Sequence, residues 1–402
     1  MGTKVSVIIP MYNCASYLPE LFQAFRNQSL KDFELICVID GATDETEALV
    51  RSYAAEDRRI RCFCKENGGA GSARNAGLKH ADGEYLVFVD ADDQYSEGYL
   101  KEMADAADSS HADVVLCQYE LHDYTTGITA KDRGFNRDFF PDRKPVDPRG
   151  IPNLFQCVTT GPTNKLFRRA MIEEYGLRFS ETHVANDVFF VLASLSAAKQ
   201  AVGIHQNLLH VRQRHNANSI TSRRAEYTEE MVTGYRQLYR WLEAQALSEP
   251  LRDTFCTAFL NSLSYNASFG VNPRLIEAAS RFLNEEAPWK DLNQDELYAV
   301  AGRCIDTAFI RKNIRNLERA IQRAEGKPQP QYEMQLTQQK NVLTSIRIIE
   351  VVSETMYGRY LEFVPKNAAE SWNYRIGSIV LWLPKQLYYL FRKLLLLCNG
   401  GS

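Results

Sequence analysis

The sequence predicts an α/β fold in which a mostly parallel sheet is flanked by helices and is followed by a C-terminal helical region. Such a sheet, with right-handed crossovers, follows from the alternation of apolar strand runs and helical patterns over the first 118 residues. Beyond residue 222 the pattern is helical. The five strand runs are residues 5–9, 35–39, 60–64, 85–89 and 114–117.

Length and composition predict more than one structural unit. A chain of 402 residues, of which 45% are apolar, is longer than a single core usually extends. We expect a first domain at 1–222, formed by two halves, 1–118 and 119–222. A helical domain at 223–370 and an amphipathic tail at 371–402 are expected to follow.

The charge balance argues against nucleic acid as a partner. The formal net charge is -3 and no long run of one sign occurs, so a nucleotide is expected to bind only as a small molecule. The nine cysteines are scattered without a C-x-x-C pair, which favours free, mostly buried thiols in a reducing cytosol. The first residues run directly into an apolar strand, so no signal peptide is expected.

Capping residues and periodicity predict the helices of the first half. Apolar residues spaced i, i+3, i+4 and i+7 predict a helix over 18–25, with Ser16 as its N-cap. A second helix is expected to begin near Thr43 and Asp44. The glycine-rich stretch at 68–77 is expected to open a third.

The segment from 119 to 222 breaks this alternation. It is rich in Gly, Pro and Asp, and we expect helices there only at 165–175 and 187–196. Because loops carry many binding residues, we expect the second substrate to bind in this half.

A pair of carboxylates follows the fourth strand run. Residues 86–89 are typical of a buried strand, and Asp90 and Asp92 lie directly after it, backed by Asp93. Ligands bind outside the carboxyl ends of strands in open α/β sheets. Two carboxylates there can hold a hard divalent cation that binds a diphosphate. An Asp-rich surface turn is the alternative interpretation.

Polar residues also follow the first two strands. Pro10 is expected to end the first strand, so that Tyr12 and Asn13 lie at its tip, where a ring and an amide could flank a nucleobase. Asp40 ends the second strand, and its carboxylate could accept a hydrogen bond from a uracil N–H. Tyr12 and Asn13 also fit a plain strand-ending turn.

The glycine-rich stretch carries one cation. Its free N–H groups can approach a phosphate or a nucleoside, and Arg74 lies among Gly and Ala, where a guanidinium suits a uracil carbonyl or a diphosphate. A ligand-free glycine turn and a surface salt bridge of Arg74 are the alternatives.

Five segments in order resemble glycosyltransferase family 2, the inverting nucleotide-sugar transferases of the bacterial polysaccharide-synthesis type. The resemblance is close over residues 4 to about 100 and looser to about 222. It implies the GT-A fold with its Rossmann-like sheet, a UDP-sugar donor, and Mn²⁺ or Mg²⁺ as cofactor. The segments are 5–13, 38–44, 67–77, 90–92 and 186–190.

The resemblance assigns the donor site residue by residue. It assigns Asp92 and Asp90 to the metal, with Asp90 also near the ribose or a metal-bound water. It assigns Asp40 to the nucleoside, although Ile39 stands where the family has the first of two paired Asp residues. His215 is a further metal candidate, and a solvent-facing histidine is its alternative. The predicted donor-binding residues are Pro10, Tyr12, Asn13, Asp40, Gly69, Arg74, Asp90, Ala91, Asp92, Arg212 and Arg214.

The acceptor hydroxyl needs a base to take its proton. The resemblance makes Asp187 that base, as the second residue of an acidic pair whose first residue is Asn186 here. Direct attack would invert the anomeric carbon. Alternatively, Asp187 caps the helix at 187–196. Residues 163–169 resemble an acceptor-side stretch, whose basic residues could equally form a solvated helix face.

The region beyond residue 222 carries two apolar patterns. A short heptad seam at 310–324, followed by a turn at 326–330, predicts a helical hairpin. Packing within the chain is favoured over a homo-oligomer seam, because fewer than three or four heptads are present. The first helix after 222 is expected to bury Met231, Tyr235, Leu238 and Leu242.

The tail combines leucines and aromatic residues with Lys385, Arg392 and Lys393. A spanning helix would place these charges in hydrocarbon and be interrupted by Pro384, so binding in the plane of a membrane is favoured. A buried core helix is the alternative. Similar tails in the family imply attachment to the cytoplasmic face of the cell membrane and a glycan or lipid-linked glycan acceptor.

Two other functional classes stay open. A metal-dependent nucleotidyltransferase would need a Gly-rich loop after the first strand, where this chain has residues 10–13 instead. An inactive, membrane-attached scaffold of the same fold is kept open by Asn186. The sugar, the linkage and the oligomeric state have no signature in the sequence.

Overall fold

A computed structural model of the chain describes residues 3–123, 129–213 and 226–267, together with 274–275, 278–279 and 281–282. The chain divides into two compact units, Met1–Val352 and Ser353–Ser402. All described residues belong to the first unit. The hairpin at 310–330 and the tail at 371–402 lie outside the described residues, and the predicted domain boundaries stay predictions.

One sheet of ten strands organises the first unit. Its first four strands lie in the order β3-β2-β1-β4 and are all parallel, because a helix connects each to the next in the chain. They are β1 Val5–Met11, β2 Phe33–Asp40, β3 Ile60–Lys65 and β4 Tyr85–Phe88. All four were predicted, but the expectation that Pro10 ends β1 is wrong, since Pro10 pairs with Val38 and Met11 with Ile39.

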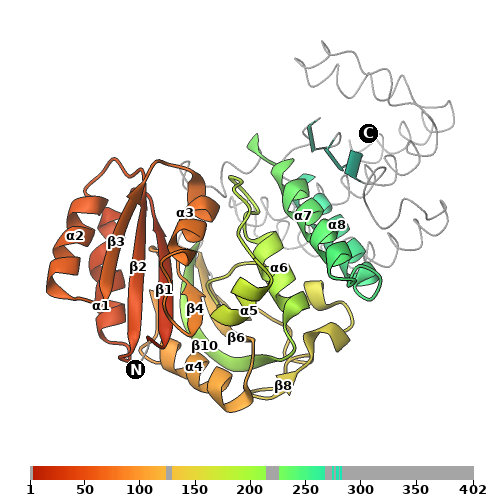
Figure 1. The fold of residues 1–402 in the computed structure, drawn as a ribbon, viewed down its shortest axis with the longest axis horizontal. Helices are drawn as coiled ribbons and strands as arrows, with labels where there is room; N and C mark the ends of the chain where they lie inside the picture. The colour runs from red at the N-terminus through yellow and green to blue at the C-terminus, as the bar shows by residue number, and fades with distance from the viewer. Residues whose placement is uncertain are drawn as a thin grey trace, which may run out of the picture. The chain divides into compact units, whose positions relative to one another are not determined.

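Helices cover both faces of these strands. Figure 1 shows α1 and α2 on one side of β1, β2 and β3, and α3 on the other. The N-cap of α1 is Tyr17, so the prediction of Ser16 was wrong. Asp44 lies just before α2, where its carboxylate accepts a hydrogen bond from Thr46 N at 3.0 Å. The helices are α1 Leu18–Arg26, α2 Thr46–Glu56, α3 Gly69–Leu78 and α4 Tyr99–Ser110.

The other half of the sheet is mixed. Strand β9 runs antiparallel between β4 and β6, and β10 runs parallel to β6 on its far side. The helix predicted at 165–175 is therefore wrong in its first part, where the chain forms β9 before α5 begins. The elements are β5 Gln94–Tyr95, β6 Val114–Asp123, β7 Thr129–Arg133, β8 Pro145–Val146, β9 Lys165–Arg168, α5 Arg169–Glu174 and β10 Ala201–Gln213.

An aromatic cluster joins the two halves. Phe88 of β4 contacts Phe167 of β9, Phe179 and Phe190, with ring centroids 4.8 to 6.0 Å apart. Phe190 belongs to α6 Val188–Ala197, so the cluster fixes the start of α6 near the end of β4. Burying four aromatic rings supplies much of the energy that holds this position.

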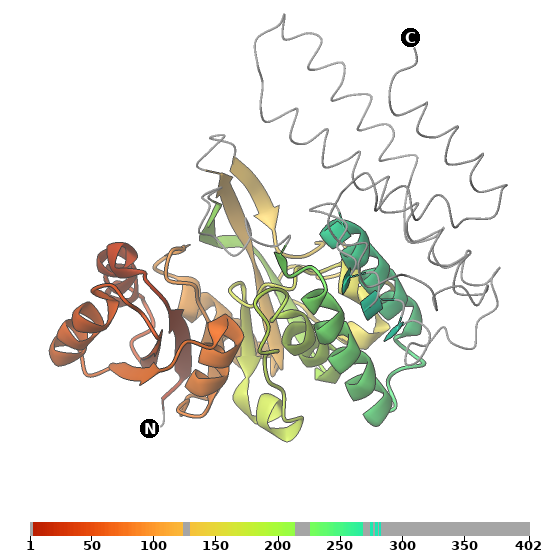
Figure 2. The same ribbon diagram turned by 90° about the horizontal axis from the view of Figure 1, so that it is seen from above.

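Two further helices follow, of which the first packs against α6 and the second against the first. They are α7 Glu230–Ala244 and α8 Arg252–Ala267, and Figure 2 shows both on the side away from β1, β2 and β3. The predicted stripe is confirmed, since Met231, Tyr235, Leu238 and Leu242 are all buried. The predicted α/β class, with a sheet flanked by helices, is confirmed by the described residues.

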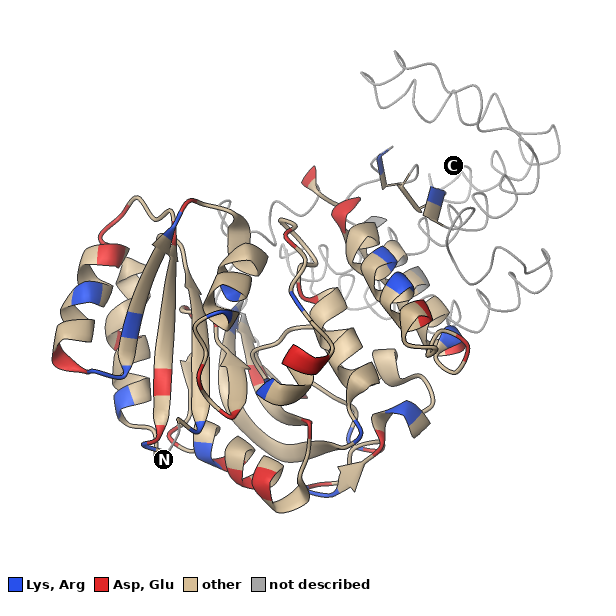
Figure 3. Ribbon diagram, viewed as in Figure 1, with Lys and Arg blue, Asp and Glu red and all other residues tan. Residues whose placement is uncertain are grey.

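Acidic and basic residues are interspersed along the described ribbon (Figure 3). The seven cysteines in the described part are free thiols, and five of them are buried. Among the described helices, none is both long and apolar enough to cross a membrane.

Candidate active site

The D-x-D carboxylates lie at the tip of β4, and a buried tyrosine fixes the turn that carries them. Asp90 N donates to Tyr95 Oη at 2.9 Å, and Tyr95 Oη donates to Asp90 O at 3.1 Å. Ala91 is buried, whereas the Asp90 side chain is 41% exposed and Asp92 is partly exposed. The two predicted metal ligands therefore reach solvent from a rigid backbone.

Asp93 anchors the same turn to β10. Its buried carboxylate accepts a hydrogen bond from Arg212 N at 3.0 Å, and the Arg212 guanidinium lies 2.5 Å from a Glu20 oxygen. Burial, followed by the charges of Asp90 and Asp92, raises the pKa of Asp93 well above its usual range. The predicted donor residue Arg212 thus lies at the D-x-D, whereas Arg214 and His215 lie outside the described residues.

Asp40 organises the glycine-rich turn. Its buried carboxylate accepts hydrogen bonds from Gly68 N at 3.0 Å and Gly69 N at 2.8 Å, and the ammonium of Lys65 lies 2.7 Å away. The strand tip of β2 is therefore tied to the start of α3. The predicted contact between Asp40 and a nucleobase stays a prediction.

Tyr12 and Asn13 lie at the tip of β1, as predicted. The ring of Tyr12 is 54% exposed. Asn13 has a positive φ of 47° and its Oδ1 accepts from Thr43 N at 2.8 Å, which joins the turns after β1 and β2. An exposed ring beside a fixed turn is a suitable surface for a base to stack on.

Arg74 connects the D-x-D to the segment before α6. Its Nη2 donates to Asp90 Oδ1 at 2.8 Å and its Nη1 donates to Asn186 Oδ1 at 2.9 Å. The residue is only 5% exposed, and its guanidinium lies 5.3 Å from the ring centroid of Phe179. The alternative of a surface salt bridge is therefore wrong, and a direct contact with a nucleotide stays a prediction.

Asp187 occupies the N-cap position of α6. Its side chain makes no capping hydrogen bond, so the interpretation of Asp187 as a helix cap has no support in the geometry. The residue is partly exposed and follows the buried Asn186. Asn186 and Arg74 connect the segment that carries Asp187 to Asp90 of the D-x-D.

Sequence reasoning left Lys165 open between an acceptor-side stretch and a solvated helix face, and it missed that the side chain is buried. The ammonium donates to Thr159 O at 2.8 Å, Gly161 O at 2.7 Å and Asn164 Oδ1 at 2.7 Å. Burial lowers the pKa of Lys165 to about 7, and the negative charge of Asp187 opposes that shift. The apolar residues 166–167 beside it were the available signal for a strand.

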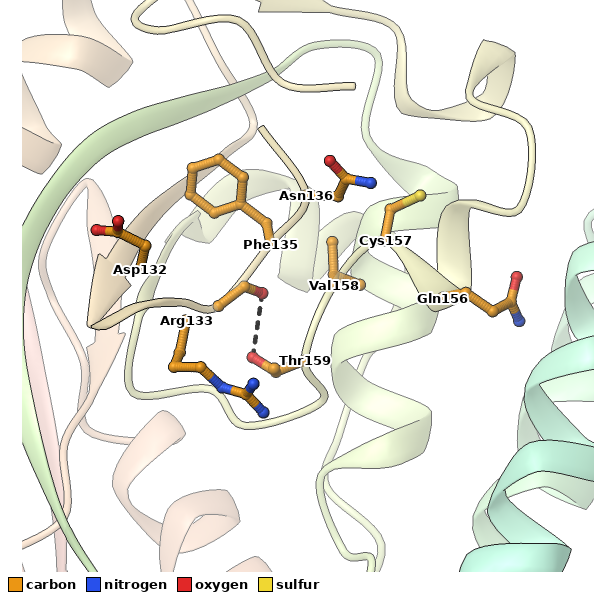
Figure 4. A pocket seen from close by; sticks show the side chains of 9 residues that line it. Asp132, Arg133, Phe135, Asn136, Gln156, Cys157, Val158 and Thr159 are labelled. Carbon is orange, nitrogen blue, oxygen red and sulfur yellow. Dashed lines mark hydrogen bonds between the residues drawn. The ribbon is translucent and has the colours of Figure 1, made fainter. Parts of the chain in front are cut away.

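A shallow hollow lies on the half at 119–222, where the acceptor is expected to bind and which we call the acceptor half. It has a cavity volume of about 250 Å³ and is bordered by residues 132–136 and 156–159. Figure 4 shows Arg133 and Thr159 on one side of it, with Thr159 Oγ1 donating to Gly134 O at 3.2 Å. Thr159 is also one of the three partners of Lys165, so the buried ammonium supports this wall.

The chain's own residues fit a divalent cation whose coordination is completed by substrate. Within the described part, no three His, Cys, Asp or Glu side chains are arranged to hold a metal alone. Mg²⁺ typically uses one or two protein carboxylates together with substrate phosphates and waters. Asp90 and Asp92, at the open end of β4, provide such a pair.

Comparison with known proteins identifies the family. The model described as Glycosyl transferase family 2 matches residues 6–176. Glycosyltransferase GlyG of Streptococcus pneumoniae serotype 4 is 30% identical over 227 residues, which are 53% of this chain and 72% of GlyG. This chain belongs to glycosyltransferase family 2.

Likeness to a solved structure supports the predicted GT-A fold. The chain is similar to Staphylococcus aureus TarS residues 1–349 in complex with UDP-GlcNAc, with a TM-score of 0.60 and 22% identity, covering 87% of this chain and 92% of that one. The chain spans 60% and 62% of two Bacillus subtilis (strain 168) relatives, EpsH and EpsJ, each 31% identical to it. Asp187 lies just beyond the matched residues 6–176, so its assignment depends on the geometry around it.

Proposed function

We propose that this chain transfers a sugar from a nucleotide diphosphate, with UDP as the nucleotide, to a hydroxyl of a glycan, with inversion of the anomeric carbon. The observation that carries the proposal is the Arg74 bridge, which connects the D-x-D to the segment of Asp187. A donor diphosphate at Asp90 and Asp92 would then lie beside a carboxylate that can act as a base.

The donor is held by the tips of β1, β2 and β4. The exposed Tyr12 ring offers a stacking surface for the base, and the Asp40 turn presents the small residues at the start of α3. Asp92 and Asp90 would hold Mn²⁺ or Mg²⁺, which stabilises the charge on the departing diphosphate by several kcal/mol. The similarity to a protein crystallised with UDP-GlcNAc supports a UDP-sugar as the first donor to test.

Asp187 acts on the acceptor. It takes the proton of the attacking hydroxyl while the bond between sugar and diphosphate breaks, a contribution worth about 10² to 10⁴ in rate. A single direct attack needs no second nucleophile, and it leaves the anomeric carbon inverted. The partly exposed position of Asp187 allows an acceptor to reach it.

A donor screen tests the proposal. UDP-GlcNAc and other UDP, GDP and dTDP sugars are incubated with Mn²⁺ or Mg²⁺, and nucleotide diphosphate release is measured for the wild type and Asp92→Ala. We expect metal-dependent release from a UDP-sugar that Asp92→Ala abolishes. Release of pyrophosphate from nucleotide triphosphate and sugar phosphate would instead indicate a nucleotidyltransferase, and absence of UDP binding would indicate a scaffold.

The acceptor and the membrane form the second part of the proposal. We infer a cell-surface glycan or its lipid-linked precursor as acceptor, with the tail at 371–402 bound to the cytoplasmic face of the membrane. The full chain should float with anionic vesicles, and Arg392→Glu with Lys393→Glu should weaken flotation. Equal flotation of the two proteins would contradict binding through the tail.

A further inference from the structure

We propose that Arg74 is a positioning residue. Through its hydrogen bonds to Asn186 and Asp90, it holds the turn that carries Asp187 against the tip of β4. The inference rests on the proposed roles of Asp90 and Asp187. It goes beyond them because it assigns Arg74 to the protein's own architecture instead of to the nucleotide. It also gives a physical reason for Asn186, where the family resemblance leads one to expect an acidic residue.

The two ends of the guanidinium have different partners. Nη2 contacts Asp90, 16 residues away in the chain, and Nη1 contacts Asn186, 112 residues away. A guanidinium has donors and no acceptor, so Asn186 must turn its Oδ1 toward Arg74 and its amide nitrogen away. One side chain thus fixes the orientation of a donor-side carboxylate and of the residue that precedes the base.

The packing around the bridge keeps Arg74 in this position. The Phe179 ring under the guanidinium stacks on Phe190 of α6 at a centroid distance of 4.1 Å. Asn75, the next residue in α3, accepts from Phe179 N at 2.8 Å and donates to Phe179 O at 2.9 Å. The helix that carries Arg74 is therefore joined to the segment before Asp187 by both backbone and side-chain contacts.

The positive charge of Arg74 explains why residue 186 carries a neutral amide. Arg74 is almost fully buried, so its single positive charge needs a compensating negative charge nearby. The Asp90 carboxylate at 2.8 Å supplies that charge. A neutral Asn186 accepts the second hydrogen bond without competing with Asp90 for Arg74.

Matched variants separate a positioning role from a nucleotide contact. Asn186→Leu keeps the side-chain shape and removes the acceptor, while Asn186→Asp keeps an acceptor oxygen. We expect Asn186→Leu and Arg74→Met each to lower kcat for transfer by at least about tenfold, and up to about 10²-fold, because the base is displaced. Asn186→Asp should recover most of that loss, and the Kd for UDP with Mn²⁺ should stay within about twofold in both Asn186 variants.

A double-mutant cycle measures the bridge directly. Arg74→Met combined with Asn186→Leu should be no worse than the more severe single variant, a coupling of about tenfold or about 1.4 kcal/mol. Multiplicative losses would overturn the proposal. So would a tenfold weaker Kd for UDP in Arg74→Met with an unchanged kcat in Asn186→Leu, because Arg74 would then be a nucleotide ligand.

Two controls keep the outcome clear. Arg51→Met removes an arginine from the exposed pair with Glu47 and should change neither kcat nor Kd. If Arg74→Met does not fold, Arg74→Lys replaces it in the same cycle. The cycle is also run on thermal unfolding without any donor, so that coupling between Arg74 and Asn186 is measured even if the wild type transfers no sugar and the proposed function fails.

Discussion

The two halves of the sheet are built in different ways. In the nucleotide-side half, β1, β2 and β3 are neighbours both in the chain and in the sheet, and each strand tip carries its own polar residues. In the acceptor half, β9 is inserted between β4 and β6 and runs antiparallel to both. The donor residues are therefore positioned by local sequence, whereas Asp187 is positioned by contacts between distant segments.

The two halves also differ in their buried charged residues. Asp40 and Asp93 have buried side chains that accept hydrogen bonds from backbone N–H groups, Asp40 from the start of α3 and Asp93 from Arg212 of β10. Arg74 and Lys165 are buried basic residues with different partners. Arg74 joins Asp90 to Asn186 and so connects the two halves, whereas Lys165 bonds to Thr159, Gly161 and Asn164 within one half.

The largest expected effect is on the rate of sugar transfer, and it distinguishes the roles of the two halves. Asp187→Asn should lower transfer by about 10² to 10⁴, because an amide cannot take the acceptor proton. The Kd for UDP with Mn²⁺, measured by calorimetry, should not change, since its ligands lie in the other half. Transfer at the wild-type rate would remove Asp187 as the base.

The aromatic cluster that joins the halves should give the next largest effect, on stability. Phe190→Ala removes a fully buried ring that contacts Phe88, Phe167 and Phe179, and it should reduce the free energy of unfolding by about 3 to 5 kcal/mol. Denaturant titration measures the loss. The control Tyr265→Ala, at a ring that is 48% exposed, should stay within about 0.5 kcal/mol of the wild type.

The close approach of α3 to the acceptor half predicts a smaller change. A Cβ at Gly71 would lie 2.0 Å from Ser180 O, so Gly71→Ala must push the two segments apart, at a cost of about 1 to 3 kcal/mol. A Cβ added at Gly161 would have no atom within 4 Å. Gly161→Ala is therefore the matched control, and equal unfolding midpoints for the two variants would refute this close contact.

The pH dependence of stability gives the smallest effect. The pKa of Lys165 falls from 10.5 to about 7 on folding, so between those values the unfolded chain binds more protons. Stability should then rise with pH in this window, on the order of 1 kcal/mol for each pH unit. The difference in unfolding free energy between wild type and Lys165→Met should grow from pH 7 to 10, and a constant difference would contradict the lowered pKa of Lys165.

Local signals predicted the first half well. Short apolar runs gave β1 to β4 within two residues at either end, and the D-x-D, Tyr12 and Asn13 lie at strand tips as expected. Each of these features depends on residues close together in the chain. Ser16 failed as a cap because a 3-10 turn, Ala15–Tyr17, precedes α1.

The acceptor half could not be predicted in the same way. Residues 165–168 carry two basic side chains, and only their pairing with β4 and β6 makes them a strand. The partners of Arg74 and Lys165 are set by that pairing, and no spacing rule connects Arg74 to Asn186 across 112 residues. Sequence therefore supplied the candidate residues of the site but missed the contacts between its two sides.

A crystal structure of Asp187→Asn with a UDP-sugar and Mn²⁺ tests the central claim most directly. The account predicts an anomalous manganese peak at Asp92 and Asp90, with the side chain at position 187 facing the anomeric carbon from the side opposite the diphosphate. Manganese bound away from those carboxylates, or a sugar turned away from position 187, would contradict it.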